Sequence, residues 1–394
     1  MRGSKGVMDV MESEKIAIFG AGYAGKVCLE NNKGKAACFI DNDIKKQGSE
    51  IEDIPVISME EYLSNFSSAK ILVPYTNFFC EMKKQLDEIG VENWEIFTEK
   101  LAPYRPTDRL VYNPYEFNPE VDESSWINKV SSRKNRHYFL LCYAKQLYAQ
   151  QPLFEGIEIE TYNRCNGVCE FCPVSAGNDT RKEQKMSMEL FHKIIDELSA
   201  IKYDRRLSLF SNNEPFLDER IIDFHEYARK QCPKARIHLF TNGTKLTLDK
   251  FQRIIDYLDE LVIDNYNVNL ELLPNVKTIK DYCEKYSDLI QKVTIALRNP
   301  KEILTTRGGD APNRKKKVSF PNAGCIRPYT QMIIRPDGKV SLCCNDPLGK
   351  NTLGDVSQKS LLDVWYGEEF DKVRKSLLSG RGSLPHCKYC DTQL

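Results

Sequence analysis

The chain has 394 residues, 41% of them hydrophobic, and carries 56 Lys plus Arg against 56 Asp plus Glu. This length allows about two to four domains, each with a core of its own. The formal net charge of zero excludes a global electrostatic attraction to nucleic acid or to an anionic membrane. No apolar run approaches the ~20 residues that span a bilayer. We therefore expect a multidomain globular protein with neither nucleic acid nor membrane as a partner.

The chain contains 14 cysteines, and residues 1–10 lack the apolar core of a secretory signal. Cysteines of a secreted chain usually form disulfides, whereas clustered cysteines in a chain without a signal favour reduced thiols and metal. We therefore expect a cytoplasmic protein that is sensitive to oxygen.

The N-terminal region begins with a predicted buried strand that runs into G-x-G-x-x-G at Gly20, Gly22 and Gly25, followed by a helical run. Such glycines permit a tight turn and the close approach of a phosphate to the helix N-terminus. A second predicted strand, residues 36–40, ends in Asp41, at about the offset where a ribose hydroxyl is held. These four residues form a candidate nucleotide site.

Helices and strands continue to alternate, with predicted helices at residues 60–65 and 79–89 and predicted strands at 70–74 and 94–97. Residues 1–100 therefore resemble a small Rossmann-like domain of the sort appended to enzymes of sugar and polysaccharide metabolism. Two interpretations stay open. The glycines bind a nucleotide, or the nucleotide part of an activated sugar, or they only let the turn pack in a docking module.

Residues 101–150 are predicted to form a linker and a helix. Pro103, Pro106, Pro114 and Pro119 exclude a long helix in the first part. The second part predicts one helix over residues 126–150, capped by the serines before it. We interpret its basic stretch as a solvated helix face rather than a nucleic-acid patch.

Three cysteines, Cys165, Cys169 and Cys172, follow a strand-like run at C-x3-C-x2-C spacing. They can converge on one small object, most simply an iron-sulfur cluster. Three ligands for a four-iron cluster leave one iron open to a chelating cosubstrate. The alternative is a set of buried or zinc-binding cysteines, although zinc sites usually pair one C-x2-C with another.

This loop, with the aromatic Phe171 before the last cysteine, resembles the signature of the radical S-adenosylmethionine (radical SAM) enzymes. The resemblance implies a [4Fe-4S] cluster on the three cysteines, S-adenosylmethionine (SAM) bound beside it with Phe171 in contact, and an α/β fold. Residues 151–310 are then a partial (β/α)6 barrel, whose loops at the carboxyl ends of the strands carry the chemistry.

The next two predicted strands end in motifs that support this resemblance. Residues 211–215 read S-N-N-E-P where the family usually has G-G-E-P, which implies that Asn213 and Glu214 meet the methionine moiety of SAM. Read alone, Glu214 is a favourable charge at a helix N-terminus. Residues 241–244 match the family's T-N-G-T turn, which implies a contact from Asn242.

Two later strands are predicted over residues 258–263 and 293–297. By position, Asp264 and Asn265 resemble the ribose contact of the family, or else they lie in an irregular loop. Arg298 is placed near the SAM carboxylate because a guanidinium forks onto a carboxylate, or else it is a surface cation. Residues 305–309 are predicted as a flexible loop that closes over a substrate.

The C-terminal segment, residues 311–394, is predicted to contain a β-hairpin over residues 331–343 and a helix over residues 361–378. Its cysteines in C…G-x4-C…C-x2-C order resemble the shortened SPASM, or twitch, extension of radical SAM enzymes. The resemblance implies a small α+β extension that holds one auxiliary [4Fe-4S] cluster on Cys325, Cys343, Cys387 and Cys390. A zinc ribbon is the alternative, and Cys344 is an alternative ligand to Cys343.

The implied chemistry is reductive cleavage of SAM to a 5'-deoxyadenosyl radical, which abstracts hydrogen from an unactivated carbon. We expect a small-molecule substrate, a sugar or nucleotide-linked sugar, that undergoes epimerisation, dehydrogenation or dehydration, and a flavodoxin or ferredoxin as reductant. Cys344 and Cys283 are candidate hydrogen donors, or else packed core cysteines. The alternatives are a maturase that modifies a peptide or protein, and a non-catalytic iron-sulfur protein with a binding or regulatory role.

Overall fold

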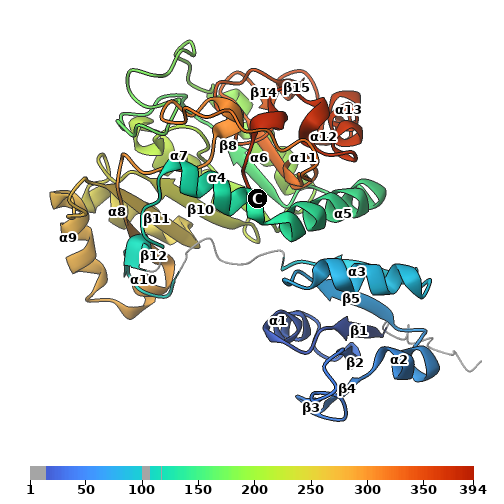
Figure 1. Cartoon of the computed structure of the whole chain (residues 1–394). Coiled ribbons are helices and arrows are strands. Elements are labelled where there is room, and N and C mark those ends of the chain that lie inside the picture. The colour runs from blue at the N-terminus through green and yellow to red at the C-terminus, as the bar shows by residue number, and fades with distance from the viewer. Residues whose placement is uncertain (1–14, 100–106, 117) are drawn as a thin grey trace, which may run out of the picture. The chain divides into compact units, whose positions relative to one another are not determined.

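The structure is a computed structural model that describes residues 15–99, 107–116 and 118–394. The chain divides into two compact units, residues 1–100 and residues 101–394. Each unit contains one mostly parallel sheet covered by helices (Figure 1).

The first unit is a six-stranded sheet in the order β3-β4-β2-β1-β5-β6, parallel except for the edge pair β3 and β4. Its elements are β1 (Ile16–Phe19), α1 (Tyr23–Asn31), β2 (Ala36–Ile40), β3 (Glu50–Ile51), β4 (Ile54–Ile57), α2 (Met59–Asn65), β5 (Lys70–Pro74), α3 (Phe79–Glu88) and β6 (Trp94–Phe97). The parallel strands, counted along the chain, lie in the order 3-2-1-4-5. This order is that of doubly wound folds and creates a switch point between β1 and β5. The short strands β3 and β4 were not predicted from the sequence.

The turn between β1 and α1 needs glycine at two positions. Gly20 has φ +101°, a left-handed conformation that side chains disfavour. A Cβ on Gly25 would lie 1.8 Å from the carbonyl oxygen of Gly20. Gly22, in contrast, faces open space, with nothing within 4 Å of a built Cβ. Two of the three glycines are therefore required by the turn itself.

We expect Gly25→Ala to lower the free energy of unfolding of the first unit by roughly 1–3 kcal/mol, because the added methyl group forces the backbone of the turn to move. Chemical denaturation of the full chain measures this loss. Gly22→Ala is the matched control and should change the stability little. Equal losses in the two variants would contradict the assignment of the close contact to Gly25.

The second unit contains a nine-stranded sheet in the order β15-β14-β13-β8-β9-β10-β11-β12-β7. Its strands are β7 (Val111–Tyr112), β8 (Gly156–Ile159), β9 (Arg206–Ser208), β10 (Arg236–Thr241), β11 (Glu260–Tyr266), β12 (Val293–Arg298), β13 (Gln331–Ile334), β14 (Lys339–Ser341) and β15 (Thr352–Asp355). The strands from β8 to β12 are parallel and follow one another along the chain, as in a barrel of βα units. The sixth strand is β7, which comes from before the barrel and pairs with β12.

Helices connect the barrel strands and cover the sheet. They are α6 (Met188–Ala200), α7 (Ile221–Gln231), α8 (Leu248–Ile254), α9 (Pro274–Cys283) and α10 (Ser287–Lys292). At the other edge, β13 pairs parallel to β8, so the C-terminal hairpin continues the barrel sheet. Figure 1 shows α9 and α10 at one end of this unit and β14, β15, α12 (Leu361–Trp365) and α13 (Glu368–Leu377) at the other. The extension therefore shares both the sheet and the core of the barrel.

Two predicted helices are wrong in their extent. The helix expected over residues 126–150 is two helices, α4 (Glu123–Ser132) and α5 (Lys134–Gln150), which break at Arg133 after two serines of low helix propensity. Its N-cap is Asp122, whose carboxylate accepts from the amide of Ser125, rather than either predicted serine. The helix expected over residues 361–378 is divided by Gly367 into α12 and α13. The remaining helix is the single turn α11 (Arg327–Thr330).

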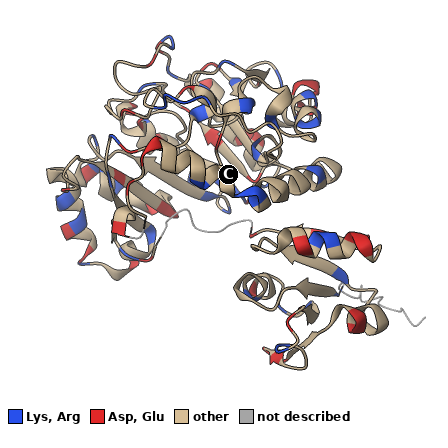
Figure 2. Cartoon of the chain, viewed as in Figure 1, with Lys and Arg blue, Asp and Glu red and all other residues tan. Residues whose placement is uncertain are grey.

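Charged side chains of both signs occur together on most surface helices, as on α3 (Figure 2). This mixing agrees with the net charge of zero. Across the described ranges, none of the helices has the length and apolar character needed to cross a lipid bilayer.

Candidate active site

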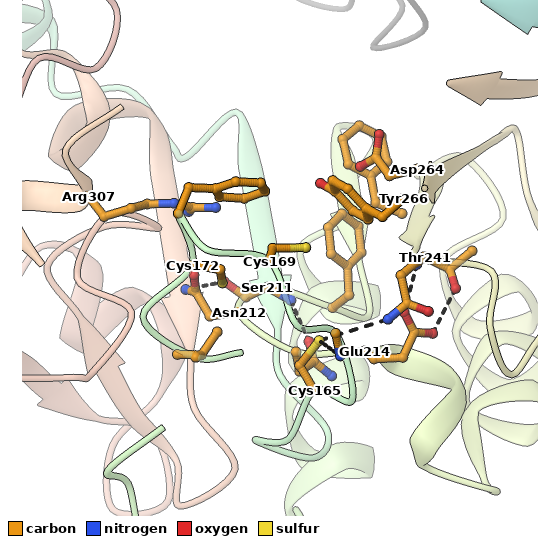
Figure 3. Close-up of a pocket in the computed structure, with 17 residues that line it drawn as sticks. Cys165, Cys169, Cys172, Ser211, Asn212, Glu214, Thr241, Asp264, Tyr266 and Arg307 are labelled. Carbon is orange, nitrogen blue, oxygen red and sulfur yellow. Dashed lines mark hydrogen bonds between the residues drawn. The ribbon is translucent and has the colours of Figure 1, made fainter. Parts of the chain in front are cut away.

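An open cavity lies at the carboxyl ends of the barrel strands. Carboxyl ends of parallel strands are where catalytic loops gather in barrel enzymes. Its walls come from the cysteine loop and from the ends of β9, β10 and β11, together with one later loop (Figure 3). The lining residues are Cys165, Gly167, Cys169, Phe171, Cys172, Val174, Phe210, Ser211, Asn212, Asn213, Glu214, Phe240, Thr241, Asn242, Asp264, Tyr266 and Arg307. We call this space the three-cysteine pocket.

The cysteine loop is tied to the T-N-G-T turn. Asn242 Nδ2 donates to Asn166 Oδ1 at 3.0 Å, and Asn166 Nδ2 donates to Thr244 Oγ1 at 2.8 Å. Within the loop, the amide of Gly167 donates to Cys165 Sγ at 3.3 Å. Gly243 has φ +75°, and a Cβ there would lie 2.8 Å from Ile263. The sequence at the end of β10 therefore positions the loop that carries the cysteines.

A buried arginine joins the two ends of this loop to the S-N-N-E-P segment. Arg181 donates to both carboxylate oxygens of Glu160 at 3.0 Å and to Asp179 at 2.9 Å. It also donates to the carbonyl oxygens of Asn163 and Asn212, both at 3.0 Å. Burial raises the pKa of Glu160 to about 7, although the Arg181 charge acts to lower it. The arginine thus holds the segments after β8 and β9 and the far end of the cysteine loop in one arrangement.

Glu214 lies at the wall of the pocket and is 1% exposed. Its carboxylate accepts from the amide of Phe216, from Thr241 Oγ1 and from the amide of Asn242, at 3.1, 2.7 and 2.7 Å. A carboxylate has about four acceptor sites, so one remains for a ligand. Burial raises the pKa of Glu214 to about 7, against the lowering effect of these hydrogen bonds. An approaching cation would stabilise the ionised form.

Strand β11 extends further than predicted, and this decides which of its residues face the pocket. Asp264 and Tyr266 line the pocket, whereas Asn265 between them points to the other face. The Asn265 side chain is fully buried, donating to the carbonyl of Glu271 and accepting from the amide of Leu273. The prediction that Asn265 contacts SAM is therefore wrong, because strand alternation turns it away.

Arg298 also lies outside the lining of the pocket. Its guanidinium pairs with Glu302 at 2.7 Å and lies 4.0 Å from Asp264. The expected contact with a SAM carboxylate is therefore not supported, because a carboxylate of the chain itself already occupies the fork. Arg298 instead influences the pocket residue Asp264. Burial raises the pKa of Asp264, and the positive charge of Arg298 lowers it.

Of the pocket residues that were not predicted as site residues, Ser211, Tyr266 and Arg307 bring polar groups that can meet a ligand. Tyr266 packs on Phe171 with ring centroids 5.9 Å apart, and period-two alternation from Asp264 was the signal for it. Arg307 has φ +50°, a strained conformation for a non-glycine residue, and reaches into the pocket from the side opposite Glu214 and Thr241 (Figure 3).

The loop that carries Arg307 was predicted to be flexible, but it is tied to the C-terminal segment. The amide of Thr306 donates to Asp391 Oδ1 at 2.7 Å, and Thr306 Oγ1 donates to the carbonyl of Tyr389 at 2.7 Å. A Cβ on Gly308 would lie 2.1 Å from the ring of His386. These contacts fix Arg307 against the segment that contains the last two cysteines.

A second, smaller pocket is lined by four cysteines and by buried polar residues. We call it the four-cysteine pocket. Its lining residues are Cys325, Arg327, Pro328, Leu342, Cys343, Asn345, Arg381, His386, Cys387, Cys390 and Thr392. Cys343 thus lies at the cavity, whereas Cys344 lies outside its lining. Burial raises the thiol pKa of Cys325 and Cys343 above the usual value.

The two pockets meet at the carbonyl of Cys344. Asn212 and Arg307, which line the three-cysteine pocket, donate to this oxygen at 3.3 and 3.5 Å. The preceding residue, Cys343, lines the four-cysteine pocket. The backbone at Cys343 and Cys344 therefore links the linings of the two pockets.

In each pocket the cysteines line an open space and do not converge on the position of one metal ion. Among the described residues, no three His, Cys, Asp or Glu side chains converge closely enough for a single metal ion. A four-iron cluster is a larger object, and thiolates are its usual ligands. Burial raises the pKa of Cys165 and Cys169 to about 12, so a bound metal must displace protons from them. The glycine amide on Cys165 and the thiol sets fit iron-sulfur clusters.

The two candidate hydrogen donors differ in their positions. Cys283 lies at the C-terminal end of α9, fully buried in the barrel core and away from both pockets. The prediction that it donates hydrogen is wrong, because α9 carries it back toward the amino ends of the strands. Cys344 lies at the junction of the pockets and accepts from Asn345 Nδ2 at 3.7 Å.

The first unit has a separate open cavity at the carboxyl ends of β1, β2 and β5. Gly20, Gly22, Gly25 and Asp41 all line it. Asp41 is already engaged, because its carboxylate accepts from the amide of Ala21 at 2.8 Å and pairs with Lys46 at 3.0 Å. The predicted nucleotide residues are therefore brought together.

Three family models match the chain. One described as "Radical SAM superfamily" matches residues 159–305, and one described as "Iron-sulfur cluster-binding domain" (SPASM) matches residues 325–391. A third, "C2185-like, N-terminal", matches residues 12–97.

Among curated proteins, the chain is similar to the S-adenosyl-L-methionine-dependent 2-deoxy-scyllo-inosamine dehydrogenase of Niallia circulans. The two are 28% identical over 241 residues, which cover 61% of this chain and 93% of the relative. Among solved structures, the chain is similar to BtrN in complex with AdoMet and 2-DOIA, with 25% identity and a TM-score of 0.52 over 61% of this chain and 93% of that chain. It is also similar to BtrN in an open conformation, with 22% identity and a TM-score of 0.46 over 61% and 92% of the two chains.

Proposed function

We propose that this chain, a radical SAM enzyme with a SPASM-type iron-sulfur domain, is a dehydrogenase that oxidises a hydroxyl group on a small sugar-like ring. Membership of the family confirms the predicted α/β barrel fold and the predicted SAM and iron-sulfur cofactors. The dehydrogenase assignment rests on the relative, which is named for the oxidation of an aminocyclitol.

The observation that carries the proposal is the meeting of the two cysteine-lined pockets at Cys344. Oxidation of an alcohol to a ketone removes one hydrogen atom from carbon, one proton from oxygen and one further electron. When bound, SAM and a cluster supply a radical for the first removal, and an auxiliary cluster supplies an acceptor for the electron. Epimerisation would not need that acceptor.

We assign the residues as follows. Cys165, Cys169 and Cys172 hold the radical SAM cluster, and the cysteines of the four-cysteine pocket hold the auxiliary cluster. The residues that contact SAM are Phe171, Asn213, Glu214, Asn242 and Asp264, all of which line the three-cysteine pocket. Ser211 and Arg307 supply hydroxyl and guanidinium groups to the substrate. The rings of Phe210, Phe240 and Tyr266 exclude water from the reacting carbon.

The test is anaerobic reconstitution with iron and sulfide, followed by assays with SAM and a chemical reductant or flavodoxin. Cyclic polyols, aminocyclitols, nucleotide sugars and peptides form the substrate panel. We expect a ketone and 5'-deoxyadenosine in equal amounts with a ring polyol or aminocyclitol. Turnover of peptides alone would overturn the proposal in favour of a maturase. No 5'-deoxyadenosine under any condition would leave a non-catalytic iron-sulfur protein.

Glu214→Gln is expected to raise the KM for SAM roughly 10- to 150-fold, because a hydrogen bond to a charged partner contributes ~1.5–3 kcal/mol. Iron content should stay unchanged. The measurement is 5'-deoxyadenosine formation against SAM concentration. Asp218→Asn is the control, since Asp218 is an equally buried carboxylate that pairs with Arg220 and lies outside the pocket lining. An equal effect of both substitutions on KM would count against a direct role of Glu214.

We also propose that the cavity of the first unit binds a nucleotide, or the nucleotide part of an activated sugar. Support comes from its place at the switch point of a doubly wound sheet and from the glycines and Asp41 in its wall. A thermal-shift screen of nucleotides and nucleotide sugars tests it. Gly22→Val should remove the shift without loss of stability, since the valine fills open space. No shift with any nucleotide would favour a docking module instead.

A further inference from the structure

Arg381 is the most deeply buried charged group at the four-cysteine pocket, with 1% of its surface exposed. All three guanidinium nitrogens donate to carbonyl oxygens: Nε to Gly324 at 3.0 Å, Nη1 to Cys390 at 2.5 Å and Nη2 to Thr392 at 2.8 Å. Gly324 precedes Cys325, and Cys390 is itself a pocket cysteine. The arginine thus crosslinks the backbone at two of the four cysteines.

The positive charge of Arg381 has no carboxylate partner among the described residues. Another buried arginine in this region, Arg314, pairs with Asp391 at 3.0 Å and Glu123 at 3.1 Å. Asp346 is a buried carboxylate whose charge acts to raise the pKa of Cys387. It is not paired with Arg381, and it accepts hydrogen bonds from the amides of Lys350 and Asn351. Carbonyl dipoles solvate a guanidinium in part, but an uncompensated buried charge is costly.

A negatively charged group bound in the four-cysteine pocket would compensate the positive charge of Arg381. Four cysteine thiolates around a [4Fe-4S] core carry a net negative charge, which increases by one unit when the cluster takes up an electron. A fixed positive charge beside the cluster stabilises the reduced form more than the oxidised form. A buried position strengthens this effect, because solvent screens it less.

We propose that Arg381 is a positioning residue that supplies the counter-charge of the auxiliary cluster and raises its reduction potential, so that the cluster accepts an electron more readily. The inference rests on the assignment of the four cysteines to an iron-sulfur cluster, and it extends the proposed function by naming the residue that tunes the acceptor. It does not depend on which substrate is oxidised.

The test is a potentiometric titration of the reconstituted full chain with dithionite and mediators, followed by electron paramagnetic resonance. A Cys165→Ala, Cys169→Ala, Cys172→Ala background leaves only the auxiliary cluster visible. We expect Arg381→Gln to lower the equilibrium constant for reduction about tenfold, a midpoint shift of about −59 mV for one electron. Arg381→Lys keeps the charge and should restore most of the potential.

The matched control is Arg374→Gln. Arg374 is also buried and also donates to two carbonyl oxygens, those of Pro328 and Trp365, but it lies outside the pocket lining and packs on the Trp365 ring. Its replacement should destabilise the fold without shifting the potential. A shift as large as that of Arg381→Gln would overturn the inference.

The remaining outcomes also support or overturn the role of Arg381. A loaded Arg381→Gln cluster with the parent potential overturns the inference and leaves the proposed function standing. A parent chain that binds only about four irons per molecule removes the auxiliary cluster and both proposals with it. If Arg381→Gln fails to load iron while Arg381→Lys loads it, the counter-charge is supported. If both fail while Arg374→Gln loads, the guanidinium geometry and not its charge is what the cluster needs.

Discussion

Replacing Cys165, Cys169 and Cys172 together by Ala is expected to abolish 5'-deoxyadenosine formation completely. The three thiols are the only cysteines that line the pocket among the described residues, so no other thiolate can take their place at the open iron. We expect the iron content to fall from about eight to about four per chain, because the four-cysteine pocket remains intact. Iron analysis and the SAM cleavage assay, both anaerobic, measure the two effects.

Two controls make this result specific. Cys283→Ala should retain cleavage, because Cys283 is a core cysteine away from both pockets. Replacing Cys387 and Cys390 by Ala should also leave about four irons, but should retain SAM cleavage while losing the oxidised product. Residual cleavage in the triple variant, or its loss in Cys283→Ala, would contradict the placement of the catalytic cluster.

Local patterns in the sequence predicted most of the barrel, because buried parallel strands appear as short apolar runs. The runs at residues 207–210 and 236–240 correspond to β9 and β10. The spacing of the cysteines and the T-N-G-T turn are also local patterns. The pocket residues on these two segments were therefore predicted from the sequence. The resemblance to radical SAM enzymes with a SPASM-type extension was inferred from these motifs, and the family models that match residues 159–305 and 325–391 confirm it.

The errors arose where a contact depends on where a strand ends. Strand β11 continues to Tyr266, and this extension turns Asn265 away and Tyr266 inward. Arg298 has a carboxylate of the chain, Glu302, four residues later, and a sequence does not reveal that this partner is in reach. In both cases a side chain that was predicted to contact SAM contacts another part of the chain instead.

Arg307 was missed for a different reason. Its position depends on Thr306 and Asp391, which are 85 residues apart in sequence. No local pattern predicts such a contact, so the loop was interpreted as flexible. The same limit applies to Arg381, whose partners Cys390 and Thr392 follow closely but whose third partner, Gly324, lies 57 residues before it.

Arg181→Met is expected to lower the free energy of unfolding by about 3–5 kcal/mol at pH 8, because it leaves the buried carboxylate of Glu160 without its cation. Asp179 keeps only its longer ion pair with Arg164, at 3.5 Å. The KM for SAM should rise as well, since Arg181 holds the carbonyl oxygens of Asn163 and Asn212 at the pocket. Anaerobic chemical denaturation and SAM-dependent cleavage measure the two effects.

The loss should depend on pH in a defined direction. The pKa of Glu160 is already raised to about 7 by burial, and removal of the Arg181 charge raises it further. A carboxyl group whose pKa is raised by folding favours the folded state below its unfolded pKa, near 4.5, and loses this contribution as the pH rises through its folded pKa. The destabilisation by Arg181→Met should therefore be smaller at pH 5 than at pH 8, where an ionised Glu160 needs the missing partner.

Arg205→Met separates this network from an ordinary ion pair. Arg205 pairs with Glu155 at 2.9 Å, but both side chains are partly exposed, at 26% and 20%, so the pair should contribute about 0–1 kcal/mol and should not affect SAM. If Arg181→Met proved no more costly than Arg205→Met, or if its cost were independent of pH, the buried carboxylates would not need the arginine. The cysteine loop would then have to be held by its contacts with Asn242 alone, and Asn242→Ala, rather than Arg181→Met, would raise the KM for SAM.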